Sequence, residues 1–294
     1  MMPEHFVRPP DWGWWILLYF FFGGLSGGSY TLGTLLRLRG SAQDSGVART
    51  AFIVSFVTLI LCPIFLTIDL GRPDRFSHML FGDNGIMFKA WSPMSVGAWA
   101  LLIFGIFSFF SFLESLEQDG KLKTRVFSGL LGGAFGKLFM LVGSAFGLYI
   151  AGYTGVLLSV SSQPVWSDTW MLGALFIASA LSGAAAAIAL AAPKRADAAA
   201  SEDTVHRLAS ADSGFIVLEL IVLALFLITL GSVAAPVIGG GYGILFWVGA
   251  VALGMLVPLI AHWFARSTSP ALIFSLVLLG NLALRAVIIF APQS

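Results

Sequence analysis

The sequence predicts an all-α integral membrane protein with eight transmembrane helices in two four-helix bundles. Hydrophobic residues make up 58% of the 294 positions and charged residues only 11%, whereas soluble domains carry roughly 25% charged residues. The mean hydropathy is +0.91. Apolar runs long enough to cross about 30 Å of hydrocarbon recur along the whole chain. Because no soluble fold hides this much apolar surface, we expect lipid to surround the protein.

Eight apolar runs are long enough to be predicted spans, since about twenty residues cross a bilayer. The fourth run is too long for an upright helix, so we expect it to tilt or to project beyond the bilayer. The polar segment 194–212 is expected to join a first half, residues 1–160, to a second half, residues 161–294. The predicted spans are 13–36, 48–70, 92–115, 128–158, 169–192, 212–235, 243–265 and 270–291.

The first run is expected to be a true span, because no basic segment or small-residue cleavage site precedes it. It begins DWGWWILLYF, which puts Trp14, Trp15 and Tyr19 at one membrane boundary. Aromatic residues gather at that depth in many membrane proteins, so an ordinary interfacial belt is the alternative to a binding role.

The second span ends in IDLGRPDRFSHML, where charge is concentrated within a few residues. Gly71 and Pro73 are expected to stop the helix, and Arg72 suits the negative end of the helix dipole. Ser92 followed by Pro93 predicts the N-cap and first turn of the third span. These local effects explain the glycine, the proline and part of the charge, but they do not explain Asp69.

The fourth span ends in YIAGYTGVLLSV, which places Tyr153 at the same boundary as the start of the first span. A weak internal repeat relates FFGGLSGG at 21–28 to IASALSGA at 177–184, each in the first span of its half. The repeat favours two related halves. Close packing of small residues between membrane helices is the alternative explanation.

Arginine and lysine residues are unequally divided between the two sets of predicted loops, and this bias sets the expected orientation. The loops after the first, third, fifth and seventh spans contain ten of them, and the opposite set contains four. Both termini are therefore predicted on the outer, periplasmic face. The ten are Arg37, Arg39, Arg49, Lys121, Lys123, Arg125, Lys194, Arg195, Arg207 and Arg266; the four are Arg8, Arg72, Arg75 and Lys89.

Five ionisable residues, Asp69, Lys137, Glu219, His262 and Arg285, are expected to lie inside the membrane, where an unpaired charge costs several kcal/mol. Lys137 and Glu219 both lie about 10–14 Å from the inner surface, so they could form a structural ion pair or a proton path. Arg285 could extend outward, pair with Asp69 or face a polar cavity near the outer surface. His262 lies close to the inner boundary and is expected to be an ordinary interfacial histidine.

Several classes of cofactor and partner are disfavoured by the residues present. A membrane cytochrome b needs facing histidine ligands, but three of the four histidines (His5, His78, His206 and His262) fall in predicted loops or tails. Cys62 is the only cysteine, which excludes a thiolate-ligated cluster. Nothing has metal-ligand spacing, and no basic cluster suggests nucleic acid. We expect no haem, iron–sulfur cluster or metal in this chain.

Several motifs together resemble the NrfD/PsrC family, the membrane subunits of polysulfide-reductase-like respiratory complexes. They occur in the family's order and cover nearly the whole chain. The motifs are IDLGRPDRFSHML, KAWSPMSVGAW, YTGVLLS, the second LSG and the closing LRAVIIFA.

The resemblance implies a multi-pass subunit of a bacterial or archaeal inner membrane, with eight spans in two bundles and no haem. Such subunits bind a quinol or quinone, either menaquinone or ubiquinone, near the outer face. They stand beside a ferredoxin-like iron–sulfur subunit, which exchanges electrons with a catalytic, often molybdopterin-containing, subunit.

By motif match, Tyr153 would donate a hydrogen bond to a quinone oxygen. Asp69 and Arg72 would belong to the quinone site or to the contact with the iron–sulfur subunit. A polar residue that the family often supplies from the first span is replaced here.

At the level of that missing residue the first span offers only Tyr19 and tryptophans, among them Trp15. His78 is a candidate substitute as proton acceptor. Lys137, Glu219 and Arg285 are candidates for a proton path from the other side.

Two other functions remain open. The protein could be a structural anchor that has lost quinone chemistry. It could also be a secondary transporter, because paired halves with charges near the midplane are compatible with that class. Four plus four spans would give two halves of the same topology, and the spans lack convincing breaks at the midplane, which disfavours the transporter.

Overall fold

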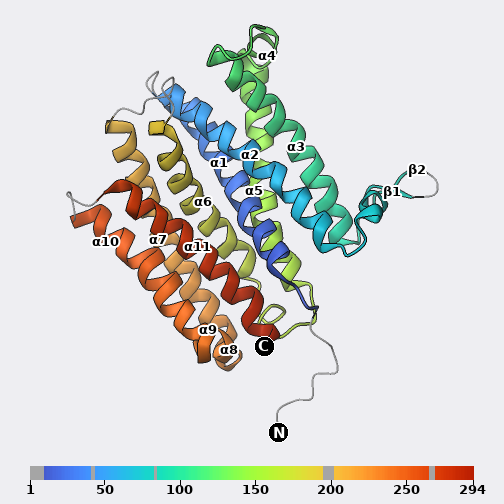
Figure 1. Cartoon of the computed structure of the whole chain (residues 1–294), viewed down its shortest axis with the longest axis vertical. Coiled ribbons are helices and arrows are strands. Elements are labelled where there is room, and N and C mark those ends of the chain that lie inside the picture. The colour runs from blue at the N-terminus through green and yellow to red at the C-terminus, as the bar shows by residue number, and fades with distance from the viewer. Residues whose placement is uncertain (1–9, 41–43, 83–84, 195–201, 265–268) are drawn as a thin grey trace.

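The computed structural model describes residues 10–40, 44–82, 85–194, 202–264 and 269–294 of the chain. Long helices run side by side and antiparallel along one direction (Figure 1). Apart from two short strands, the described secondary structure is helical. The long helices are α1 (Trp14–Arg39), α2 (Ser45–Asp69), α3 (Pro93–Gln118), α5 (Gly133–Ser159), α6 (Leu172–Ala191), α7 (Glu202–Leu230) and α11 (Pro270–Phe290).

Between α7 and α11 the chain passes through shorter pieces. After η5 (Gly231–Ala234) and α8 (Ala235–Ile238), one continuous rod is formed by α9 (Gly240–Ile244), the π-helix η6 (Leu245–Leu256) and α10 (Val257–Phe264). The π-helical part packs against α11 at a position where both helices have glycine. A Cβ on Gly254 would lie 2.4 Å from the Cα of Gly280, so only glycine allows this approach.

Within the residues that the structure describes, seven helical segments are long and apolar enough to cross a membrane. They are Ser45–Asp69, Pro93–Gln118, Gly133–Ser159, Leu172–Ala191, Arg207–Ile238, Gly240–Phe264 and Pro270–Gln293. Each corresponds to one of the predicted spans. The predicted first span forms α1, which is helical over 26 residues but is not one of the seven.

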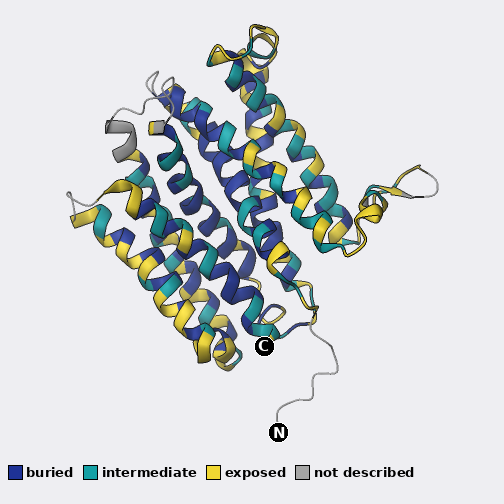
Figure 2. Ribbon diagram, viewed as in Figure 1, coloured by how far each residue is buried: buried dark blue, intermediate teal, exposed yellow. Residues whose placement is uncertain are grey.

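The lower hydropathy of α1 follows from its position in the middle of the molecule. It packs against α2, α5, α6 and α11, and every residue from Gly23 to Thr34 is buried. A Cβ on Gly27 would lie 2.0 Å from the carbonyl oxygen of Gly147 in α5, and one on Gly28 would lie 2.4 Å from that of Ala180 in α6. Figure 2 shows this central region in dark blue, with exposed residues on the flanking helices. Small residues allow this close packing.

Two predicted boundaries are wrong. The fourth run does not form one helix, because it divides into α4 (Val126–Leu130) and α5. The break falls at Gly133, whose φ of +65° favours glycine. The sixth span begins earlier than predicted, since α7 starts at Glu202 within the segment expected to be a polar joint.

The end of α2 and the start of α3 are confirmed. Gly71, with φ +63°, follows the last residues of α2, and the Ser92 hydroxyl accepts a hydrogen bond from the Ser95 amide at 3.4 Å. Between them the chain forms η2 (Pro73–Met79) and a hairpin of β1 (Phe81–Gly82) and β2 (Gly85–Ile86). This stretch projects from one side of the helical body (Figure 1).

Candidate functional site

Tyr153 of α5 lies at the end of the molecule where α3 begins. Its hydroxyl donates a hydrogen bond to the Pro93 carbonyl oxygen at 2.6 Å. Its ring fits against Gly97, where a Cβ would come within 2.3 Å of the ring and hydroxyl. The side chain is buried. Tyr153 is therefore fixed between α5 and the first turns of α3, and its proton already has an acceptor.

Tyr149 lies one turn before Tyr153 on the same helix, and the two rings stack with centroids 5.7 Å apart. Tyr19 of α1 is also buried and lies in the neighbourhood of both tyrosines and of Cys62. We call Tyr19, Tyr149 and Tyr153 the tyrosine cluster. Tyr149 was not a predicted site residue, although its spacing of four from Tyr153 puts both on one helical face.

A cavity of about 270 Å³ opens beside the tyrosine cluster, between α3, α5 and the segment leading into α3. The Trp99 indole closes one side by donating to the Met87 carbonyl oxygen at 3.0 Å. Tyr149 supplies the phenol on a wall that is otherwise apolar except for this tryptophan. The cavity is lined by Phe88, Val96, Trp99, Ala100, Ile103, Phe146 and Tyr149.

The remaining predicted site residues of the first half lie around this end without joining the cluster. Trp15 is partly exposed and stacks on Phe65 of α2 at 5.9 Å. Asp69 is half-buried, and Arg72 and His78 are exposed. Among the described residues, no hydrogen bond or ion pair links Asp69, Arg72 or His78 to the three tyrosines.

Arg285 is enclosed by protein instead of extending outward or pairing with Asp69. Its guanidinium donates to the Ser179 hydroxyl at 2.7 Å and to the Asn281 and Phe176 carbonyl oxygens at 3.3 and 3.4 Å. It also lies over the Phe176 ring, 5.1 Å from the centroid. Glu219 lies near enough to interact electrostatically with Arg285 and Ser179.

Lys137 and Glu219 do not form the pair that their depths suggested. Lys137 is exposed on α5 and lines a cavity in the first half together with Arg37 and Glu114. Glu219 is 1% exposed and lies within electrostatic range of Arg285 in its own half, although no ion pair between these two described residues forms. Equal depth along the membrane normal says nothing about lateral position, which is why sequence depth alone failed here.

The His262 side chain is 6% exposed and has a specific partner. Its Nε2 lies 3.0 Å from a carboxylate oxygen of Asp212 in α7. The Ser182 hydroxyl of α6 donates to the other oxygen of Asp212 at 3.0 Å. Asp212 was not predicted, although it precedes Glu219 by seven residues and so shares its helical face.

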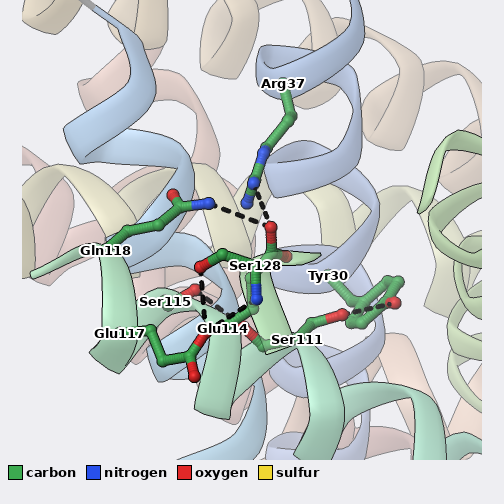
Figure 3. Close-up of polar contacts among 8 residues, drawn as sticks. All are labelled: Tyr30, Arg37, Ser111, Glu114, Ser115, Glu117, Gln118 and Ser128. Atoms are coloured by element: carbon green, nitrogen blue, oxygen red, sulfur yellow. Dashed lines mark hydrogen bonds and ion pairs between the residues drawn. The ribbon is translucent and has the colours of Figure 1, made fainter. Parts of the chain in front are cut away.

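A further polar cluster occupies the α4 end of α1, α3 and α5 (Figure 3). Arg37 forms an ion pair with Glu114, whose same oxygen accepts from Gln118 at 2.9 Å. Glu117 accepts from the Ser128 amide at 2.6 Å and from its hydroxyl at 2.9 Å. The cluster was not predicted, because charges near a span end are ordinary in membrane proteins.

Within the described part of the chain, no three histidine, cysteine, aspartate or glutamate residues come together as a metal site would require. Cys62 is buried and free.

These features define a multi-pass integral membrane protein, with charged side chains paired between its helices and an aromatic cavity near one end. It belongs to the NrfD polysulphide reductase family, whose model, described as "Polysulphide reductase, NrfD", matches residues 3–294.

Three relatives illustrate the similarity. "Protein NrfD" of Escherichia coli (strain K12) is 30% identical over 309 aligned positions, covering 96% of this chain and 95% of the relative. A polysulfide reductase chain of Wolinella succinogenes is 24% identical over 304 positions, covering 96% and 94%. A selenate reductase subunit of Mesobacillus selenatarsenatis is 39% identical over 70 residues, which are 24% of this chain and 16% of the relative.

Proposed function

We propose that this protein is the quinone-binding membrane subunit of a respiratory reductase complex. It would exchange electrons between the quinone pool, menaquinone or ubiquinone, and a ferredoxin-like iron–sulfur partner. That partner would serve a catalytic subunit containing molybdopterin. Family membership supports the general role, and relatives are named as parts of polysulfide and selenate reductases. The observation that carries the quinone assignment is the apolar cavity beside the tyrosine cluster.

The residues around that cavity fit a quinone. Apolar and aromatic walls suit a ring with a prenyl chain, and ligand sites of this kind need only a few placed polar groups. Tyr149 supplies a phenol that lines the cavity. A bound quinol supplies two electrons and two protons to the site. The protein's own groups must therefore orient a ring and accept or pass protons.

Tyr149 and Tyr153 would divide this work. We assign the first contact with the ring oxygen to Tyr149, because its phenol lines the cavity. The predicted donor, Tyr153, would have to exchange its bond to the Pro93 carbonyl for one to the ligand. In its present position it stacks on Tyr149 and so positions it. Tyr19 would close the buried side of the cluster.

Proton exit would use Asp69 and His78, as the motif match suggests. Asp69 ends α2 and His78 lies in the exposed η2 turn, so both can reach water. A proton path from the opposite side would have to use Glu219 and Arg285, without Lys137. Proton movement along that path would then depend on the hydrogen bonds around Ser179.

The projecting stretch from Arg72 to Trp91 is the proposed contact with the iron–sulfur partner. It carries the exposed charges Arg72 and Arg75 together with exposed apolar side chains, which include Phe76 at 56% and Trp91 at 82%. Aromatic and arginine side chains are enriched in protein interfaces. A stretch of this composition at the same end as the tyrosine cavity would keep the electron path short.

We further propose that α1 is the eighth span and that both termini lie on the outer face. At 1.5 Å per residue, 26 residues extend about 39 Å, enough to cross. The Trp12 amide donates to the Gln293 side chain at 2.8 Å, so the start of α1 and the end of α11 lie at the same end of the helices, as an even number of spans requires. A four-plus-four division into bundles follows the predicted halves.

Quinol oxidation by the intact complex tests the assignment. Replacing Tyr149 with Phe should lower kcat/KM about three- to tenfold, the usual value of one neutral hydrogen bond. Replacing Tyr153 with Phe should cost a similar factor. The matched control is Tyr242→Phe, since Tyr242 lies in α9 of the other half. Full activity and unchanged inhibitor binding in both test variants would refute the site.

A structural anchor without quinone chemistry is the alternative. It predicts that the purified complex contains the partner subunits but no extractable quinone. A transporter would be purified without iron–sulfur or molybdopterin subunits, so co-purification separates all three functions.

A further inference from the structure

The cavity at the α4 end is separate from the tyrosine cavity and differs from it in chemistry. Its volume is about 270 Å³, and it lies where α1 and α3 end and α5 begins. Charged, hydroxyl and amide side chains share its wall with leucine and methionine. The residues that matter here are Arg37, Glu114, Gln118, Ser128 and Lys137.

Two buried polar atoms of these lining residues have no hydrogen-bond partner among the described residues. Glu114 is 2% exposed; its Oε1 accepts from Arg37 and Gln118, whereas its Oε2 has no hydrogen-bond partner among the described residues. Nη1 of Arg37 is likewise without a partner there. A buried carboxylate oxygen left unpaired costs free energy. The wall therefore contains one buried acceptor and one buried donor that no described residue satisfies.

The start of α5 adds positive potential. Gly132 and Gly133 line the cavity, and the helix has no side-chain N-cap. The first amides of a helix lack intrahelical acceptors and carry the positive end of the dipole. Lys137 stands one turn further along. Among the lining residues two side chains are cationic and one is anionic, so the formal charge of the wall is +1.

Glu117 does not cancel this charge inside the cavity. Its carboxylate stands behind Ser128 and is satisfied by the Ser128 amide and hydroxyl and by the Thr124 hydroxyl at 2.5 Å. Its effect is to hold the α4 turn in place, as Figure 3 shows for Ser128. The loop between α3 and α4 adds the exposed cations Lys121 and Lys123.

The cavity leads onto a surface suited to hydrocarbon. Beyond Lys137, α5 exposes Leu138 and Leu141 at 60% and 53%, and Phe135 lies before it at 57%. A ligand with a polar group at Arg37 and an apolar tail along α5 would match both parts. Lipid headgroups lie at the depth where apolar helices end, which is the level of this cavity.

We propose that this cavity binds the headgroup of an anionic glycerophospholipid, with phosphatidylglycerol as the best fit. Its phosphate lies by Arg37 Nη1, Lys137 and the first amides of α5, and a headgroup hydroxyl donates to Glu114 Oε2. Its single negative charge complements the +1 wall. Phosphatidylcholine has no donor for Glu114, and inorganic phosphate would meet the same carboxylate without gaining the hydrocarbon contacts along α5.

Lipid exchange on the full chain, purified with any subunits that accompany it, tests the proposal. The protein is placed in nanodiscs of phosphatidylcholine containing a minor fraction of phosphatidylglycerol or phosphatidylethanolamine. Retained lipid is then measured by native mass spectrometry and thermal stability by unfolding. We expect selective retention of phosphatidylglycerol, and stabilisation by it but not by inorganic phosphate.

Lys137→Gln should lower phosphatidylglycerol retention about fivefold, the value of one cation at a membrane surface. Lys137 is exposed, so this change should leave folding intact. Lys123→Gln is the matched control, because it removes a nearby cation that does not line the cavity, and it should leave retention unchanged.

Glu114→Gln provides an independent test of selectivity. It keeps an acceptor for Arg37 but removes the negative charge, so inorganic phosphate should now stabilise the protein. Four results would overturn the proposal: equal retention of phosphatidylcholine, equal retention of phosphatidylethanolamine, stabilisation of the wild type by inorganic phosphate, or equal losses in the Lys137 and Lys123 variants.

Discussion

Asp212 joins three helices although nothing in its local sequence marks it. Ser182 of α6 donates to one of its carboxylate oxygens, and His262 of α10 lies beside the other, each at 3.0 Å. All three side chains are enclosed by protein. Since buried polar groups need partners, these three stabilise the contact between the helices as one unit.

Replacing Asp212 with Ala should lower the free energy of unfolding by about 1–3 kcal/mol for each buried partner left unsatisfied. Thermal unfolding in detergent measures the loss. Asp74→Ala, at an exposed position of η2, should change stability by less than about 0.5 kcal/mol.

The double variant Asp212→Ala, His262→Ala measures the coupling free energy between the two residues. If the two residues act together, the double change should cost less than the sum of the single changes. Additive losses would show that the Asp212–His262 contact contributes little.

The sequence was informative about which charges lie in the membrane but not about their partners. Glu219 and Arg285 were predicted as intramembrane charges, and the structure places them in one network. Arg285 binds mostly Ser179 and backbone carbonyls, which have no charge pattern to detect. Glu114 and Asp212 lie near the ends of predicted spans, where a carboxylate is common and does not indicate a buried site. They are buried by helices that are distant in sequence, which the local sequence does not reveal.

Glycines determine how closely α1 can approach its neighbours. At Gly27 the obstacle to a side chain is the backbone of α5, which cannot rotate away as a side chain can. Gly27→Ala should therefore separate the helices and destabilise the protein by about 1–3 kcal/mol, the usual cost of overpacking. Thermal unfolding and the yield of folded protein report the effect.

Gly105→Ala in α3 is the matched control. No atom lies within 4 Å of the position that its Cβ would take, and alanine favours a helix over glycine by about 1 kcal/mol. This variant should be as stable as the wild type or more so. Equal behaviour of the two variants would contradict the close α1–α5 contact.

The helices themselves were largely predictable, because apolar runs of this length have few other structures available in lipid. Turn chemistry gave the end of α2 and the start of α3, at Gly71 and Ser92. The break at Gly133 was missed, since glycine is also common inside membrane helices. The π-helical winding of η6 was not predictable, because its apolar sequence reads like that of any other membrane span.

Topology can be tested by cysteine labelling in a Cys62→Ala background. With eight spans and both termini outside, a membrane-impermeant maleimide should label Pro10→Cys and Ser294→Cys in intact cells. Lys123→Cys, at the α4 end, should react only after the membrane is opened. With α1 as the eighth span the number of crossings is even, which places Trp12 and Gln293 on the same side of the membrane.

Two patterns would contradict this topology. Labelling of Pro10→Cys and Ser294→Cys from opposite sides would mean an odd number of spans. If Lys123→Cys reacted in intact cells and Pro10→Cys and Ser294→Cys reacted only after the membrane is opened, the arginine and lysine bias would not set the orientation.

The central place of α1 has a consequence for biosynthesis. It is synthesised before α6 and α11, two of the helices that cover it. Until α6 and α11 have been made, the face of α1 that they cover, with its glycines, serines and threonines, is exposed to lipid. Thr31 and Thr34 bond to carbonyl oxygens of their own helix, Gly27 and Tyr30, at 2.9 and 3.0 Å, which satisfies these hydroxyls before any neighbour arrives. Assembly should therefore be completed only after translation ends, and a protein truncated before α11 should expose α1 to membrane proteases.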